Sequence, residues 1–355
     1  MIPVLVTNAQ GYLGRHVVNE LRNQGHEVIA RDALPQDPAG LTNLEDALRH
    51  VQAVVHLVDP LHPLDRDTER PAEGLDPLHT LLRAMCAAGV GRLVLQSSLG
   101  IYGEGRYIDG DGRAHPVWRT QADLKAGEWE ARGLRNQPLA PMPTPEDAPP
   151  APLSPAARLC HLRERLARRW ARVAGAEIAV LRMGRLFGPP AESGAGFCGG
   201  VGMMVASILA GKPPLLMEDG GQTEDWLHVR DAARAVRLAL VNCDRRMPPL
   251  NISTGKGHTA REVAQLAGMA AFDYGLTARE VQLACPGTSR HLVGCPGAAA
   301  ERIGFTAETR LSNGLGEMVH WVKTNGIPAH DRILLRKLQE TGQLVGPGRA
   351  EAAHA

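Results

Sequence analysis

A glycine-containing turn near the start of the chain has the residue types of a phosphate-binding site. The turn, Thr7–Gly14 (TNAQGYLG), follows the apolar run Val4–Val6 and precedes a helical pattern with one apolar face. Such a turn directs backbone N–H groups and the positive end of a helix dipole at one point, where they can hold a pyrophosphate. Gly11 would let the backbone approach the ligand, and Gly14 would let the helix pack on the strand. The residues expected to form this cradle are Thr7, Asn8, Gln10, Gly11, Tyr12, Leu13 and Gly14.

The residues after the next predicted strand bear on the choice of dinucleotide. Gly25–Asp32 reads as that strand, and it ends in Arg31-Asp32. An acidic residue about 20 positions past the turn bonds the ribose 2′-OH of NAD, whereas an Arg there suits the 2′-phosphate of NADP. With Arg31 on that phosphate and help from Arg15, the sequence leans towards NADP(H) and leaves NAD(H) open. The alternative interpretation is that Arg31 and Asp32 are two solvated charges at the end of a strand and bind no cofactor.

Alternating strand and helix patterns must position these residues. Three apolar runs are typical of buried parallel strands: Val4–Val6, Val51–Val58 and Arg92–Gln96. A helical pattern over Leu78–Ala88 stands between the last two. Leu57 and Val58 are expected to lie along the cofactor, and Ser97 near its nicotinamide. The alternation predicts an α/β fold with a doubly wound parallel sheet of the Rossmann type.

Composition excludes several classes of function. A net charge of +1 over 355 residues argues against nucleic acid as a partner. Because no apolar run reaches the length of a membrane span and Met1 leads straight into a strand, we expect no membrane segment or signal peptide and a cytoplasmic location. The six cysteines form no CxxC pair and the 14 histidines have no metal-binding spacing, which favours reduced thiols and no metal site.

Four segments, taken together, carry a family pattern. They are Thr7–Gly14, Ser97–Gly103 (SSLGIYG), Val180–Pro189 (VLRMGRLFGP) and Gly220–Asp231 (GGQTEDWLHVRD). They resemble the TGxxGxxG, SSxxxYG, LRxxNxYGP and GDGxQxRDFxxVxD patterns of the extended short-chain dehydrogenases, which include the nucleotide-sugar epimerases and dehydratases. Asn8 stands at the first Gly of the turn, and Asn tolerates positive φ better than most residues. The resemblance covers almost the whole chain.

This resemblance implies a domain organisation and one catalytic group. It implies a Rossmann dinucleotide-binding domain over residues 1–183 and a smaller C-terminal α/β substrate lobe over 184–330, with 225–255 returning to the central sheet. A terminal helix and tail would follow over 331–355. Ser98 matches the hydroxyl residue that polarises the substrate carbonyl or alcohol.

One segment, residues 104–149, is longer than the loop that these enzymes carry there. It is polar, rich in Gly and Pro, free of cysteine, and contains Trp118 and Trp129. Long loops without secondary structure are uncommon and often serve as lids. Two Trp in a polar segment favour docking on an apolar surface or ligand. We therefore expect a lid over the substrate.

The catalytic pair of the family is missing. The helix after Pro155 begins with YxxxK in these enzymes, where the Tyr is the general acid/base and the Lys lowers its pKa. In this sequence Ala156 stands at the Tyr position and Cys160 at the Lys position. A shift of register does not restore the pair, because no tyrosine is followed four residues later by Lys; the tyrosines are Tyr12, Tyr102, Tyr107 and Tyr274.

Three further positions depart from the family pattern. Gly74 stands where an Asn supports the active site, and Arg185 replaces the Asn of the LRxxN loop. Glu224 replaces the Arg that grips nucleotide phosphates in the sugar enzymes. Because a carboxylate there would repel a diphosphate, the sequence argues against a nucleoside-diphosphate sugar.

Three functions fit these departures: a nucleotide-binding pseudoenzyme, a sugar epimerase or dehydratase, and a ketoreductase whose substrate supplies the proton. A phenol beside the ketone has about the pKa of tyrosine, near 10, so it could replace the lost group. The combination resembles the atypical extended short-chain dehydrogenases that act as angucyclinone ketoreductases in antibiotic biosynthesis. We therefore expect NAD(P)H-dependent reduction of an aromatic polyketide ketone. The residues expected at the substrate are Ser98, Trp118, Trp129, Arg185, Met203 and Met204, with Trp226 as a further candidate; core packing is the stronger alternative for Met204 and Trp226.

The oligomeric state stays open. The helix Ala156–Ala174 often builds a dimer interface in the family that the chain resembles. Here it carries six arginines that could oppose close self-packing: Arg158, Arg163, Arg165, Arg168, Arg169 and Arg172.

Overall fold

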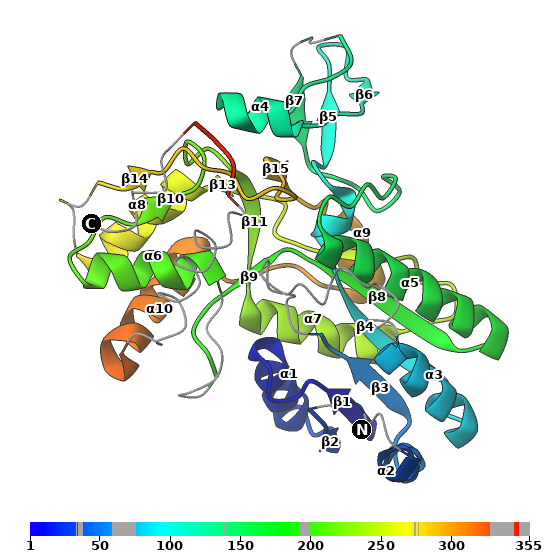
Figure 1. The fold of residues 1–355 in the computed structure, drawn as a ribbon. Coiled ribbons are helices and arrows are strands. Elements are labelled where there is room, and N and C mark those ends of the chain that lie inside the picture. The colour runs from blue at the N-terminus through cyan, green and yellow to red at the C-terminus, as the bar shows by residue number, and fades with distance from the viewer. Residues whose placement is uncertain are drawn as a thin grey trace.

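A parallel sheet of six strands forms the centre of the computed structural model (Figure 1). The structure describes residues 1–32, 34, 38–58, 76–135, 137, 139–191, 199–272, 275, 277–326 and 344–347. The strands are β1 (Val4–Thr7), β2 (Val28–Ala30), β3 (Ala53–His56), β4 (Arg92–Ser98), β8 (Glu177–Met183) and β12 (Leu250–Ile252). Their order is β2-β1-β3-β4-β8-β12, and every neighbouring pair is parallel. The predicted doubly wound α/β fold is confirmed.

Side-chain alternation divides this sheet between two apolar cores. On β1, Val4 and Val6 pack on one face and Leu5 on the other, as expected for strands covered on both sides. The first face is covered by α1 (Tyr12–Asn23), α7 (Val229–Asn242) and α9 (Gly297–Ile303). The second is covered by α2 (Pro38–Leu48), α3 (Asp76–Ala88) and α5 (Pro155–Ala174). Because helices cover both faces of the sheet, the carboxyl ends of its strands are the part that the helices leave uncovered.

A second unit is built around three helices that share a core. These are α6 (Gly199–Leu209), α8 (Ala260–Ala271) and α10 (Leu311–Asn325). Beside them lie two small sheets, one of β9 (Arg185–Phe187), β11 (Thr223–His228), β13 (Gly257–Thr259) and β15 (His291–Leu292), the other of β10 (Leu215–Leu216) and β14 (Arg279–Glu280). Within the segment 225–255, β12 is a strand of the central sheet and α7 covers one of its faces, whereas β11 belongs to the second unit.

The segment 104–149 is not a structureless loop, which corrects the sequence interpretation. It holds a three-stranded antiparallel sheet and a helix, and projects from one end of the molecule (Figure 1). Its elements are β5 (Arg106–Ile108), β6 (Ala114–His115), β7 (Ala140–Met142) and α4 (Gln121–Ala126). A capping box between Thr120 and Asp123 starts α4. Turn and capping residues therefore give secondary structure to a segment that has few apolar residues.

Most predicted elements agree with the structure within a few residues. The helix predicted over Leu78–Ala88 begins at Asp76, and the strand predicted over Val51–Val58 is shortened to Ala53–His56. Gly74 lies outside the described residues, and so do the terminal helix and tail predicted over 331–355, apart from residues 344–347. None of the described helices is long and apolar enough to cross a membrane. Among these same residues, no group of three His, Cys, Asp or Glu side chains could hold a metal ion.

Candidate cofactor and active site

The turn between β1 and α1 has the backbone geometry of an anion cradle. Asn8 adopts a left-handed conformation with φ of 50°, as the sequence predicted for its place at a Gly position. Gly11 precedes α1 with an extended backbone, and no side chain caps the helix. The first turn of α1 also holds no acidic residue. The first N–H groups of α1 and its positive dipole end are therefore available to a phosphate.

A side chain would collide with neighbouring atoms at two glycines of this turn, and at Gly14 those atoms belong to the backbone. A Cβ on Gly14 would lie 1.9 Å from the carbonyl oxygen of Asn8, and one on Gly11 would lie 2.7 Å from the Asn8 side chain. Gly14 thus lets the helix pack against the backbone of the turn, which refines the predicted contact with the strand. A dinucleotide pyrophosphate fits this arrangement, because the turn approaches the helix closely while no side chain caps the first N–H groups of α1.

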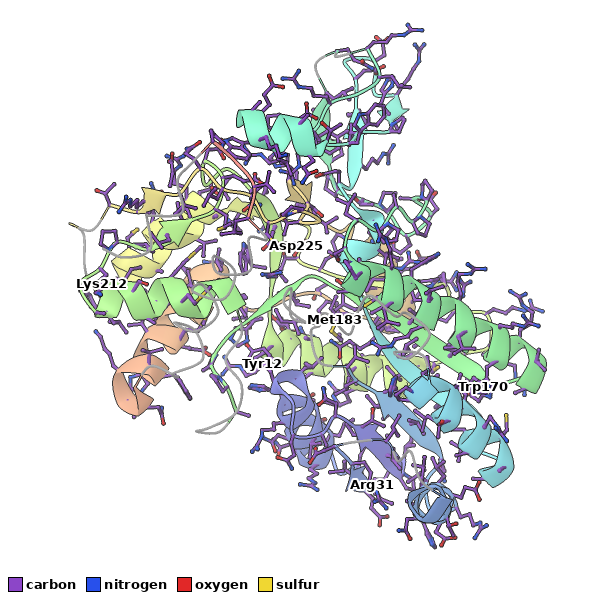
Figure 2. The ribbon with its side chains drawn as sticks, in the orientation of Figure 1. Tyr12, Arg31, Trp170, Met183, Lys212 and Asp225 are labelled. Carbon is purple, nitrogen blue, oxygen red and sulfur yellow. The ribbon has the colours of Figure 1, made fainter. Side chains whose placement is uncertain are left out.

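One rim of the turn carries the residues expected at the adenosine end of a dinucleotide. Asp32 accepts a hydrogen bond from the backbone N–H of Gln10 at 2.8 Å. Arg15 donates to the carbonyl of Gln10, and Arg31 donates weakly to the carbonyl of Asn43 at 3.4 Å. In Figure 2, Tyr12 lies at the start of α1 and Arg31 at the end of β2. The geometry brings Asp32 to the turn, and the predicted preference for NADP(H) stays a prediction.

The hydroxyl of Thr7 is used inside the protein. It lies 2.8 Å from Nδ1 of His56 and accepts from the backbone N–H of Leu57, so it joins the ends of β1 and β3. The N–H of Val58 donates to Gln96 of β4 at 3.0 Å. Tyr12 likewise donates to the carbonyl of Gly188. Of these predicted cofactor residues, Thr7 and Tyr12 could therefore contribute only backbone groups.

Burial of His56 makes stability depend on pH. Burial, with a further contribution from nearby Arg163, lowers the pKa of His56 from 6.5 to about 3. The folded state therefore binds fewer protons than the unfolded state between these values, so stability is complete above pH 6.5 and falls as the pH is lowered towards 3. Between pH 7 and 5.5, the free energy of unfolding of the wild-type protein should fall by about 1 kcal/mol more than that of His56→Gln, as measured by urea unfolding. His50→Gln, at an exposed position, is the control; an unchanged pH dependence in His56→Gln would contradict the prediction.

The hydroxyls of the two serines at the end of β4 differ in burial and in hydrogen-bond partners. Ser98 is half-buried, and its Oγ accepts from the N–H of Gly100 at 3.0 Å. A Cβ on Gly100 would lie 3.7 Å from Ala157, which places this turn beside the start of α5. Ser97 is buried and donates to Glu164 at 2.5 Å. The hydroxyl of Ser98 therefore stays a candidate substrate donor, whereas that of Ser97 is committed to the interior.

The start of α5 offers no proton relay. Ala156 and Cys160 occupy its first two turns, and burial raises the pKa of the Cys160 thiol to about 11. Each tyrosine in the described part of the chain is buried with its hydroxyl elsewhere. Tyr12 bonds Gly188, Tyr102 bonds Asn251 with its pKa raised by burial to about 12, and Tyr107 lies inside the 104–149 segment. The absence of the family's Tyr/Lys pair is thus not compensated by another described phenol.

A buried polar network behind Ser97 was not foreseen. Arg182 on β8 pairs with Glu164 at 2.9 Å and donates to the hydroxyl of Tyr102 at 2.6 Å. Tyr102 in turn donates to Asn251 of β12. The sequence signal was a single charge inside the otherwise apolar strand VLRM, since a buried Arg requires a partner. This network fixes the strand ends that carry Ser97 and Ser98.

The residues predicted to line a substrate pocket fall into separate groups: Arg185, Met204 and Trp226 belong to the second unit, and Trp118 and Trp129 to the 104–149 segment. Trp129 packs with Leu124 and Ala284, while Trp118 of the same segment is 40% exposed. Trp226 belongs to the core of the second unit, and Met204 packs against that core. Core packing is therefore the correct interpretation for Met204 and Trp226, and Trp129 is a packing residue. Met203 is half-buried on α6.

Arg185 and Glu224 form an ion pair. Their side chains approach to 3.6 Å, from the neighbouring parallel strands β9 and β11. The carboxylate of Glu224 thus faces a cation, which weakens the electrostatic argument against a diphosphate-bearing substrate.

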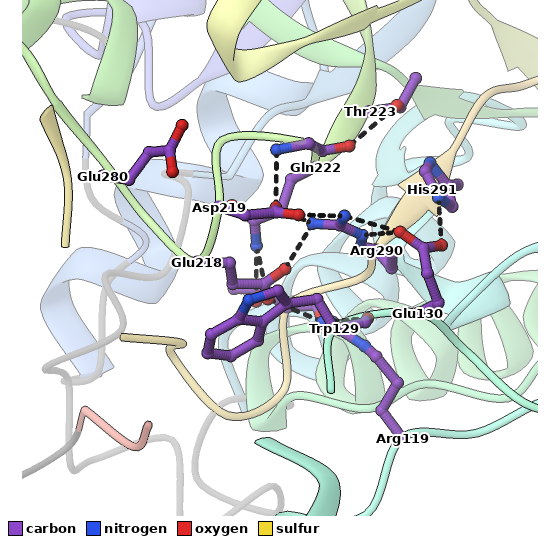
Figure 3. Close-up of polar contacts among 12 residues, drawn as sticks. Arg119, Trp129, Glu130, Glu218, Asp219, Gln222, Thr223, Glu280, Arg290 and His291 are labelled. Atoms are coloured by element: carbon purple, nitrogen blue, oxygen red, sulfur yellow. Dashed lines mark hydrogen bonds and ion pairs between the residues drawn. The ribbon is translucent and has the colours of Figure 1, made fainter. Parts of the chain in front are cut away.

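Buried ion pairs anchor the 104–149 segment to the second unit (Figure 3). Arg119 bonds Glu104 at 2.8 Å within the segment and Glu218 at 2.7 Å outside it. Arg290 joins Glu218 to Glu130, whose pKa is lowered to about 2 by hydrogen bonds from His291 and Arg290. These contacts hold the segment against residues 218–222 and 284–295. Whether it covers a bound substrate stays a prediction.

Breaking this anchor should release the segment. Arg119→Met leaves Glu104 and Glu218 buried with less compensation, so we expect faster proteolysis within 104–149 and a loss of about 3 kcal/mol. Arg113→Met is the matched control, because its ion pair with Asp111 is exposed at 3.6 Å in the same segment. Equal proteolysis of both variants would show that the buried pairs do not anchor the segment.

Comparison with known proteins decides the family. The family model described as "NAD dependent epimerase/dehydratase family" matches residues 4–123 and 135–253. The chain belongs to this family. The resemblance to this family inferred from the sequence is thereby confirmed.

Individual relatives of this family member are distant. A putative UDP-glucose 4-epimerase of Methanocaldococcus jannaschii is 24% identical over 91% of the chain and 99% of its own length. A dTDP-L-rhamnose 4-epimerase of Burkholderia thailandensis is 25% identical over 66% of the chain, and the match spans 63% of that relative. A dTDP-4-dehydro-6-deoxy-D-allose reductase of a Streptomyces species is 26% identical over 75% of the chain and 79% of its length. The solved structure of MoeE5 in complex with UDP-glucose and NAD is 28% identical with a TM-score of 0.70, covering 91% of this chain and 99% of that one.

Proposed function

We propose that this protein is a nicotinamide-dependent ketoreductase whose substrate supplies the proton. The observation that carries the proposal is the start of α5, where Ala156 and Cys160 replace the acid/base pair while Ser98 keeps its place. Hydride delivery to a ketone builds an alkoxide that must be stabilised and protonated. Because the described residues offer Ser98 but no phenol or Lys there, the proposal assigns the proton to the substrate.

The cofactor assigned by this proposal is NAD(H) or NADP(H). The N–H groups of Tyr12, Leu13 and Gly14 would face its pyrophosphate, and Asp32 with Arg15 and Arg31 its adenosine end. When bound, the cofactor would supply the hydride. The family description and the NAD in the MoeE5 complex support a nicotinamide dinucleotide, without deciding between its two forms.

The substrate proposed is an aromatic polyketide ketone flanked by a phenol. An internal O–H···O bond would both stabilise and protonate the alkoxide, because phenol has about the pKa of tyrosine, near 10. The support is the resemblance of the sequence to the angucyclinone ketoreductase of simocyclinone biosynthesis, which also lacks the Tyr and Lys. A place in antibiotic biosynthesis follows from that resemblance.

A nucleotide-sugar epimerase or dehydratase is the second candidate. The relatives favour it, because epimerase names predominate among them, and the Arg185–Glu224 pair removes the simple repulsion of a diphosphate. The reductase among the relatives shows that the same family also includes an enzyme named for the reduction of a keto sugar. The missing Tyr/Lys pair counts against epimerisation, which needs an acid/base at the sugar.

The test is a reaction of the purified chain with NADPH, and separately NADH, and a phenolic angucyclinone ketone. Cofactor oxidation is followed by absorbance and the product by mass. A gain of two hydrogens that is lost on methylation of the neighbouring phenol supports the ketoreductase. Conversion of UDP-glucose or a dTDP-sugar in a parallel reaction would favour the second candidate. Cofactor binding without turnover of either would indicate a nucleotide-binding pseudoenzyme.

Removal of Ser98 should have a modest effect. Since Ser98 has no relay behind it to replenish a proton, Ser98→Ala should lower kcat less than about 1000-fold, or roughly 4 kcal/mol. Ala156→Tyr should bring little gain in the same assay. A larger loss in the first variant would make Ser98 the acid, and a large gain in the second would mean that the missing tyrosine limits the rate.

A further inference from the structure

A cavity of about 500 Å³ runs beside α5, apart from the cofactor site. One wall is formed by a row of α5 side chains: His161, Arg165, Arg168, Arg169 and Arg172. The other wall is formed by residues 146–150 together with Pro249. Neither the turn 7–14 nor Ser98 lines it. We refer to this cavity as the arginine groove.

The arginines of the groove carry uncompensated charge. Arg165, Arg168, Arg169 and Arg172 are exposed, and none makes an ion pair or hydrogen bond within the described parts of the chain. They stand three and four residues apart on one helix, where like charges are neighbours and repel one another. A row of this kind is more stable when an anion lies across it.

The carboxylates of the groove balance only part of this charge. Glu164 is occupied by Arg182 at 2.9 Å, and Glu146 accepts from the backbone N–H of Asn251 at 2.9 Å. Asp147 is exposed and has no polar partner among the described residues. Glu146 and Asp147 thus carry two negative charges opposite the four arginines, and a net positive charge remains in the groove.

We propose that the arginine groove binds a small molecule with two or more phosphoryl groups. From Arg165 to Arg172 the helix rises about 10 Å, which suits consecutive phosphoryl groups better than a single anion. Guanidinium groups bind phosphate oxygens in bidentate pairs. A volume of about 500 Å³ is that of a small-molecule site, and Pro149, Pro150 and Pro249 add an apolar wall for a non-phosphate part. The inference does not depend on the proposed ketoreductase activity.

The test is calorimetric titration of the full chain with inorganic tripolyphosphate, in the presence of saturating NAD⁺ so that the turn after β1 does not bind the probe. Arg168→Gln/Arg172→Gln should raise the Kd about tenfold or more. Asp147→Asn should lower it, because it removes the opposing charge. The matched control is Arg22→Gln/Arg302→Gln, which removes the same charge from exposed helix positions on α1 and α9.

Three results would overturn the proposal. They are the absence of binding, an equal loss of affinity in the control, and orthophosphate binding as tightly as tripolyphosphate. Thermal melting by circular dichroism verifies that each variant is folded. If the double variant did not fold, the tightening expected in Asp147→Asn would still decide the question.

Discussion

Gly14→Ala is expected to destroy the dinucleotide site and to destabilise the fold. The added methyl group would lie 1.9 Å from the carbonyl oxygen of Asn8 and within 3 Å of the Ala9 backbone. Backbone atoms cannot move aside as a flexible side chain can, so α1 and the turn must separate. Overpacking of this kind costs about 3 kcal/mol in the free energy of unfolding.

The same displacement should weaken cofactor binding. If it removes one charge-assisted hydrogen bond to the pyrophosphate, worth about 1.5–3 kcal/mol, the Kd for NAD(H) rises about 10- to 100-fold. Fluorescence titration with NADH measures this Kd, and urea unfolding measures the stability. Binding of NADH by Gly14→Ala with the wild-type Kd would place the cofactor somewhere other than the turn after β1.

Gly316→Ala is the matched control. Gly316 also lies inside a helix, α10, but a Cβ there would meet nothing within 4 Å. Replacing a helical Gly that has free space should stabilise the protein by about 0.5–1 kcal/mol and leave NADH binding unchanged. The contrast separates the steric requirement at Gly14 from the general cost of glycine in a helix.

The parts of the site that could be predicted from sequence depend on local backbone chemistry. The strand–turn–helix unit, the positive φ of Asn8 and the place of Ser98 at a strand end each follow from a few adjacent residues. The central sheet could also be predicted, because short apolar runs that alternate with helical patterns are compatible with few folds other than a parallel sheet. Local patterns therefore predicted the backbone of the site well.

Contacts between distant segments were the part that could not be predicted. The direction of the Ser97 hydroxyl depends on Glu164, 67 residues later, and the docking of Trp129 depends on Ala284. Glu224 was interpreted as a free negative charge because its partner, Arg185, is brought close only by the pairing of β9 with β11. A single sequence gives the residue types of such pairs but not their pairing.

Arg182→Met should be among the most destabilising single substitutions in the central sheet. Arg182 is 4% exposed, and it holds Glu164 by two nitrogens and Tyr102 by a third. Its removal leaves a carboxylate buried without a cation, which costs about 3–5 kcal/mol. Urea unfolding at pH 7 measures this loss. Arg92→Met is the control, because its 2.7 Å pair with Glu177 is partly exposed and should cost at most about 1 kcal/mol.

A double variant distinguishes the charge from the packing. Arg182→Met/Glu164→Leu removes both charges and fills the space with apolar atoms, so most of the lost stability should return. The hydroxyl of Ser97 then loses its acceptor, Glu164, while Ser98 keeps its bond to Gly100. If the double variant were as unstable as Arg182→Met, the bonds to Ser97 and Tyr102, rather than the ion pair, would be what holds β4 and β8 at the active-site edge.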